Sequence, residues 1–142
     1  MRDWIVPATG RVVLVSLARG DDFLQSIQAA LAHSGVRSGV VLSAVATLAH
    51  CRLHQVQSAD DVEDQRILEL DGPLELTSAS GVVANGEAHL HATVADRAGH
   101  AYGGHLEPDC PVLFLAEVSV LAVDAPGMAR TRGADGIARL HN

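Results

Sequence analysis

The sequence contains no lysine and few aromatic residues, and both shortages limit what the protein can be. Its 10 Lys and Arg residues are all arginine, and 17 Asp and Glu residues bring the formal net charge to −7. Nucleic-acid-binding domains usually carry a clustered basic face, for which this composition offers little material. Aromatic residues make up 3% of a chain that is 48% hydrophobic, so the core must be built from Val, Leu, Ala and Ile. Such small side chains suit closely packed sheets.

Cysteines and long apolar runs are also scarce. Cys51 and Cys110 lie far apart, which fits neither a disulfide framework nor a Cys-rich zinc motif. We interpret them as reduced thiols. No apolar run reaches the roughly 18 residues of a membrane-spanning helix, and residues 1–4 lack the order of a secretory signal peptide. We therefore expect a cytoplasmic protein without a membrane segment.

The length of 142 residues matches a single domain. We expect this domain to span residues 1–142, with a core at about 11–123. After Pro126 the composition turns to Gly, Arg, Asp and Ala, which predicts a loose C-terminal tail over 124–142, with Leu140 docking at its end.

One helix is predicted near the N-terminus. Phe23, Ile27 and Leu31 recur at helical spacing on one face. Asp21 or Asp22 can cap the first turn, and a glycine at position 35 can end the helix.

The rest of the chain predicts strands joined by tight turns. Asn85-Gly86 is a strong hairpin signal, because both residues tolerate a positive φ. A second turn is predicted at Asp71-Gly72-Pro73, and an acidic loop at 58–64. Antiparallel strands with one main helix indicate an α+β domain built on a mostly antiparallel sheet. The strands are expected at 11–18, in two short pieces within 39–56, and at 66–70, 74–84, 87–95, 100–106 and 112–123.

Histidines stand out on the strand predicted at 87–95. Apolar and polar residues alternate there, so His89 and His91 share the face that points away from the core. A three-residue loop closed by Gly99 would place His105 directly opposite His91, with Cβ atoms about 4.5–5.5 Å apart. A four-residue loop would turn His105 to the other face.

Three imidazoles on one face can bind one Zn²⁺, each at about 2.0–2.1 Å. Without a fourth protein ligand, such a site is open and can activate water near neutral pH. The alternative is that His89, His91 and His105 are only polar residues on a solvated sheet face.

The segment GEAHLHATVADRAGHAYGGHL (86–106) resembles the signature of the plants-and-prokaryotes conserved (PPC, or DUF296) domain family. The shared features are His-x-His, an Asp and a Gly at the strand end, and Gly-Gly-His. Upstream, Glu75, Ser78 and Gly81 are similar to the Glu-x-x-Ser-x-x-Gly strand of the family, and Arg19–Asp22 to the segment that opens its helix. The chain departs from the family at Ser43–Thr47, where glycine is more usual.

The resemblance implies an antiparallel α/β fold assembled as a homotrimer. Several stand-alone prokaryotic relatives have no assigned function, and some hold a metal at the histidines. Plant members are nuclear regulators that largely lack this histidine set. We therefore predict a homotrimeric domain that binds a divalent metal, with zinc as first choice, through His89, His91 and His105. Its role would be small-ligand binding or metal-assisted hydrolysis.

The competing hypothesis is a DNA-associated regulatory or protein-interaction module. An AT-hook core, Arg-Gly-Arg-Pro, would favour it, but the sequence has Thr131-Arg132-Gly133-Ala134 instead. With the acidic net charge, this predicts that direct DNA binding is absent.

Several residues near the predicted site have open roles. Ser80 should oppose His91, where it is either structural or a nucleophile. Glu107 should oppose His89 as an outer partner or general base, and Glu117 needs a partner if it is buried. His50 and His54 are interpreted as strand polarity, and His100 as exposed. No catalytic residue is assigned.

Overall fold

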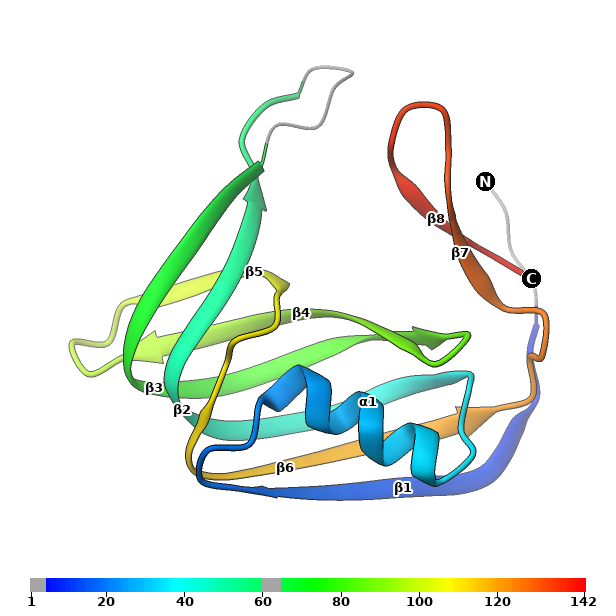
Figure 1. Cartoon of the computed structure of the whole chain (residues 1–142), viewed down its shortest axis with the longest axis horizontal. Coiled ribbons are helices and arrows are strands. Elements are labelled where there is room, and N and C mark those ends of the chain that lie inside the picture. Colours follow the sequence, from blue (N-terminus) through cyan, green and yellow to red (C-terminus); the bar gives the residue numbers. More distant parts are fainter. Residues whose placement is uncertain (1–4, 60–64) are drawn as a thin grey trace.

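The computed structural model describes residues 5–59 and 65–142, which form one helix and eight strands (Figure 1). The N-terminal residues 1–4 and most of the acidic loop predicted at 58–64 lie outside this range. The elements are β1 (Ala8–Ala18), α1 (Phe23–His33), β2 (Gly39–Val56), β3 (Gln65–Ala84), β4 (Glu87–Asp96), β5 (Ala101–Leu106), β6 (Val112–Val123), β7 (Ala129–Arg132) and β8 (Ala138–His141).

The predicted α+β architecture is confirmed. Six strands pair antiparallel in the order β1-β6-β2-β3-β4-β5, and β7 pairs with β8. β2 also pairs with β5, so that β2, β3, β4 and β5 form a closed ring of strands. This closure brings the far end of β2 beside β5.

The helix α1 lies against one side of the sheet (Figure 1). Its inward residues Phe23, Ile27 and Leu31 are fully buried in the main core. Asp22 caps the helix, accepting a hydrogen bond from the backbone N–H of Gln25 at 2.8 Å. These features follow the predicted helix, and Asp22 rather than Asp21 is the cap.

Two strand boundaries differ from the prediction. Residues 39–56 form one strand rather than two, and the turn predicted at Asp71-Gly72-Pro73 lies inside β3. The ladder between β2 and β3 shifts register between Leu48 and His50, beside Gly72 and Pro73. Both strands continue through this shift, so neither is divided. A Cβ on Gly72 would lie 2.5 Å from the carbonyl oxygen of Leu48, so glycine here permits close strand packing.

The C-terminal segment also differs from the loose tail that we predicted. It forms the β7–β8 hairpin, in which Arg130 pairs with Leu140. Leu140 packs against a small second core of Ala84, Ala125 and Met128, as its predicted docking required. The Gly- and Asp-rich composition of this segment therefore marks a tight turn between two strands rather than a disordered end.

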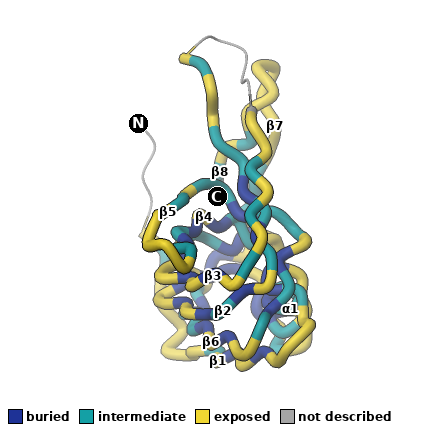
Figure 2. The backbone as a smooth tube through the Cα atoms, turned by 90° about the vertical axis from the view of Figure 1, so that its left-hand side faces the viewer, coloured by how far each residue is buried: buried dark blue, intermediate teal, exposed yellow. Residues whose placement is uncertain are grey.

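Buried and exposed residues alternate along the sheet (Figure 2). The residues that face α1 are apolar and buried, and the opposite face of β1, β2 and β6 exposes large apolar side chains together with Glu117 and several serines. Leu14 is 80% exposed and Phe114 is 61% exposed. We call this surface the outer face: Val12, Leu14, Val40, Leu42, Val45, Phe114 and Leu115. Within the described residues, no helix is long and apolar enough to cross a membrane.

Candidate metal centre

His89 and His91 of β4 meet His105 of β5 through the predicted register. The ladder pairs His91 with His105. The three-residue loop also forms as predicted: the N–H of Gly99 donates to the carbonyl of Asp96 at 3.0 Å, and Gly99 has φ +86°. The turn therefore sets the register that gathers the three imidazoles.

The spacing of the three imidazoles fits one metal ion. His89 Nε2 lies 3.4 Å from His91 Nε2 and 3.3 Å from His105 Nδ1. Three nitrogens at about 2.0–2.1 Å from a tetrahedral ion would be about 3.3 Å apart. No other His, Cys or carboxylate in the described part of the chain completes this group. The donor set therefore suits a tetrahedral ion with one open position.

Two of these histidines are held neutral by their surroundings. Burial, helped by the nearby His54 and His89, lowers the pKa of His105 to about 4, although Glu107 acts in the opposite direction. Burial also lowers the pKa of His89, followed by the positive charge of Arg130. Neutral imidazole is the form that binds metal.

This environment predicts how the stability of the metal-free protein depends on pH. An unfolded histidine titrates near 6.5, whereas folded His105 has a pKa of about 4. Between these values the unfolded state binds more protons, so stability should fall as the pH drops from 6.5 to 4. We expect this histidine to contribute on the order of 1 kcal/mol, after allowance for its partial exposure to solvent.

Urea unfolding of chelator-treated protein at pH 4.5 and 7.5 measures the effect. The variant His105→Asn cannot titrate there and should lose part of the pH dependence. If the wild type and the variant change equally between the two pH values, the proposed environment of His105 is wrong.

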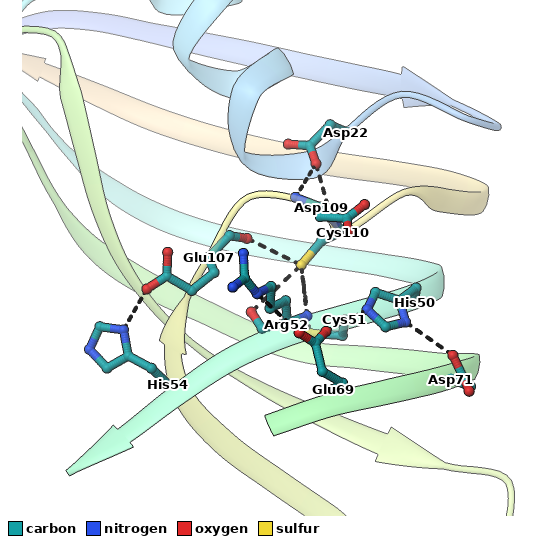
Figure 3. Close-up of polar contacts among 10 residues, drawn as sticks. All are labelled: Asp22, His50, Cys51, Arg52, His54, Glu69, Asp71, Glu107, Asp109 and Cys110. Atoms are coloured by element: carbon teal, nitrogen blue, oxygen red, sulfur yellow. Dashed lines mark hydrogen bonds and ion pairs between the residues drawn. The ribbon is translucent and has the colours of Figure 1, made fainter. Parts of the chain in front are cut away.

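His54 of β2 is part of this centre, and the sequence interpretation missed it. β2 pairs with β5 at His54 and His105. The two rings stack with centroids 4.4 Å apart. His54 Nδ1 lies 2.5 Å from Glu107 Oε1, the contact drawn in Figure 3. His54, His105 and Glu107 also form a second possible set of metal ligands. The short contact identifies His54 and Glu107 as a hydrogen-bonded pair beside the three histidines.

Glu107 does not oppose His89, contrary to the prediction. The β4–β5 ladder ends at His91 and His105, and the chain then turns toward β2. The backbone N–H of Glu107 donates to the carbonyl of Arg52 at 3.0 Å. Glu107 therefore forms a hydrogen bond to a histidine of the centre, as one of its predicted roles required, but this histidine is His54 and not His89.

Two other predicted positions can be placed. Ser80 does oppose His91, and it is exposed. Glu117 lies on the outer face of β6 and is exposed, so it is not the buried acid that would have needed a partner.

The remaining strand and turn histidines lie outside the cluster. His50 bonds to Glu69 at 2.9 Å and to Asp71 at 3.1 Å, which agrees with its interpretation as strand polarity. His100 is exposed at the turn, with its Nδ1 3.2 Å from a carboxylate oxygen of Asp96.

The segment that carries Glu107 is tied to the start of the helix. The carboxylate of Asp22 accepts hydrogen bonds from the backbone N–H groups of Asp109 at 2.7 Å and Cys110 at 2.9 Å (Figure 3). Cys110 and Cys51 are buried free thiols with their sulfur atoms 3.9 Å apart. The helix cap thus fixes the position of the loop that supplies Glu107.

A cavity of about 650 Å³ opens beside the cluster. Its walls come from the histidine strands on one side and from the β7–β8 hairpin on the other. A smaller recess of about 390 Å³ is also lined by His89 and His105. The larger cavity has the size of a small-molecule site. Its lining includes His54, His89, His91, His105, Glu107, Arg132, Ile137 and Ala138.

Comparison with known proteins identifies related sequences. Residues 6–124 match the model of the Plants and Prokaryotes Conserved (PCC) domain family. A bifunctional protein GlmU from one Synechococcus strain is 34% identical over 138 residues, and that from another strain is 35% identical over 108 residues. These alignments cover 95% and 76% of this chain but only 21% and 16% of the two relatives. The chain thus corresponds to a small part of each.

Solved structures share the fold over nearly the whole chain. A metal-containing protein from Archaeoglobus fulgidus has a TM-score of 0.83 at 24% identity, covering 100% of both chains. A plant- and prokaryote-conserved protein from Pyrococcus horikoshii has a TM-score of 0.83 at 21% identity, covering 100% of this chain and 98% of its own. A candidate DNA-binding protein from Bacteroides thetaiotaomicron has a TM-score of 0.78 at 18% identity, covering 96% of each chain.

Proposed function

The chain belongs to the Plants and Prokaryotes Conserved domain family, and on this premise we propose that it is a metal-binding domain centred on His89, His91 and His105. The observation that carries the proposal is the convergence of three imidazole nitrogens within 4.8 Å of one another, with His89 Nε2 only 3.3–3.4 Å from the other two, which suits one tetrahedral ion. The similar protein from Archaeoglobus fulgidus is described as metal-containing, which supports it. Zinc is our first choice, because imidazole ligands and an open position suit that ion.

The side chains around the three histidines support ligand binding in the cavity. A zinc ion held there would supply Lewis-acid chemistry to a small ligand. Glu107 holds Nδ1 of His54, which fixes the ring of His54 at the cavity wall. His54 could then exchange a proton with the ligand. We propose small-ligand binding as the role, with metal-assisted hydrolysis as the reaction class that such a site would serve.

Elemental analysis of untagged protein, purified without chelator, tests the metal proposal. We expect about one divalent ion per chain, because the three imidazoles converge on one position. Zinc reconstitution followed by gel filtration should restore this content after treatment with a chelator. A content far below one ion per chain after reconstitution would contradict the proposal.

We also propose that the domain assembles as a homotrimer through its outer face. Exposed apolar side chains that gather on one face mark interaction sites, and the unpaired edge of a sheet needs a partner that covers it. The expected particle has the mass of three chains of 14.8 kDa. Leu14→Glu adds a second charge to this face, on the edge strand β1 and near Glu117, and should shift the protein toward the monomer.

Light scattering at micromolar concentration measures the assembly. The matched control is Gln25→Glu, which adds the same charge at an exposed position on α1 and should remain trimeric. A wild-type protein that stays monomeric would defeat the proposal.

A DNA-associated role is the second candidate, because the similar protein from Bacteroides thetaiotaomicron is a candidate DNA-binding protein. Non-specific DNA affinity comes mostly from neutralised phosphates, and a net charge of −7 offers little of it. We therefore propose that this chain does not bind duplex DNA at physiological salt. A salt-sensitive gel shift at sub-micromolar protein would favour the DNA-associated role instead.

A further inference from the structure

Arg130 of β7 lies beside the histidine centre and has no ion-pair partner among residues 5–59 and 65–142. It lines the smaller recess together with His89 and His105. Its side chain is partly buried, and its Nε atom is shielded from solvent without a hydrogen-bond partner. By contrast, Arg139 of the same hairpin pairs with Asp135 at 2.5 Å.

The two charged residues that line this recess are Arg130 and Glu87, and Glu87 is exposed to solvent, whereas Arg130 is partly buried. Glu107, which lines the larger cavity, is bonded to His54. The positive charge of Arg130 reaches His89, since it helps to lower the pKa of that imidazole. A divalent cation held by three neutral imidazoles would add two further positive charges. Burying such charges without an opposite charge is costly.

We propose that the recess takes a small anionic ligand, a carboxylate or phosphate group that lies between the cation held by the histidines and the guanidinium of Arg130. This inference rests on the proposed metal-binding function. A guanidinium offers paired N–H donors that match the oxygens of carboxylates and phosphates. The larger cavity shares His89 and His105 with the recess, has Arg132 on its wall and is of a size to hold the rest of a metabolite that carries such a group.

Three variants test the role of Arg130. Arg130→Gln removes the charge, and Arg130→Lys keeps the charge but loses the paired donors. The matched control is Arg139→Gln, which removes an arginine from the same hairpin at an exposed position. Circular dichroism and thermal unfolding establish that each variant is folded.

The probes are inorganic phosphate and acetate, titrated into cobalt-substituted protein. The visible spectrum of cobalt reports anion binding without any assay of activity, and calorimetry on zinc-loaded protein gives the affinity. We expect saturable binding to the wild type and to Arg139→Gln. Arg130→Gln should bind at least about tenfold more weakly, since a charge-assisted pair is lost, and Arg130→Lys should lie between. The tighter of the two probes indicates whether phosphate or carboxylate is the preferred group.

The outcomes separate this inference from the proposed function. If the protein holds metal and Arg130→Gln binds both anions as tightly as the wild type, the inference is overturned and metal binding stands. If the protein holds no metal, the proposed function fails. In that case, phosphate that raises the thermal stability of the wild type but not of Arg130→Gln would still support an anion site, and equal behaviour of the two proteins would overturn it.

Discussion

Replacing His105 with alanine should remove most of the bound metal, and replacing His100 with alanine should leave metal binding nearly unchanged. His105 is one of three converging imidazoles, so its loss leaves two ligands. Loss of an outer partner of a metal ligand costs roughly 10–100-fold in affinity, and loss of the ligand itself should cost more. His100 is exposed and bonded to Asp96, away from the cluster.

Elemental analysis after dialysis and competition with a coloured chelator measure the two variants. His54→Ala is a third variant for comparison, because His54 stacks on His105 without belonging to the three-histidine group. It should weaken binding less than His105→Ala does, because it removes a ring that packs on a ligand and not a ligand itself. If His100→Ala loses metal while His105→Ala keeps it, both the strand register and the assignment of the ligands are wrong.

Replacing Gly104 with alanine should destabilise the protein and weaken metal binding together, whereas Gly103→Ala should do neither. A Cβ on Gly104 would lie 2.6 Å from the backbone oxygen of His54, so β5 would have to move away from β2. A Cβ on Gly103 would lie 3.5 Å from the nearest atom, an ordinary contact. Overpacking of this kind costs about 1–3 kcal/mol, and more where backbone must shift. His105 is the next residue and would move with β5.

Urea unfolding and metal content check this pair of variants. Since the two substitutions are chemically identical and adjacent, general effects of alanine on a strand cancel between them. Equal stability of the two variants would mean that β5 does not approach β2 as closely as the structure shows.

The local part of the centre was predictable from the sequence because its determinants are short-range. Strict alternation over 87–94 places His89 and His91 on one face, and the glycine at position 99 permits the turn that returns His105 to them. Each inference needs only residues within one hairpin. The register was therefore confirmed, while the metal stays a proposal.

The contribution of β2 was not predictable in the same way. His54 and Glu107 are 53 residues apart, and nothing in either segment indicates that β2 pairs with β5. β3 was predicted as two strands for a related reason. Gly72 and Pro73 are typical turn residues, but here they lie inside the strand, where the pairing of β3 with β2 decides the structure. Arg130 was likewise missed, because composition alone does not show that the C-terminal residues pair and pack.

The three partners of β2 have a consequence for how the chain folds. β3 follows β2 directly, but β5 and β6 are made only after β3 and β4. Until they emerge during synthesis, both β2 and the early β2–β3 pair keep unpaired edges open to other chains. Such non-local pairing is typical of domains that fold in milliseconds to seconds. The β4–β5 hairpin gathers His89, His91 and His105 by itself, whereas His54 joins them only when β5 also pairs with β2, so the complete centre exists only in chains that have finished this late step.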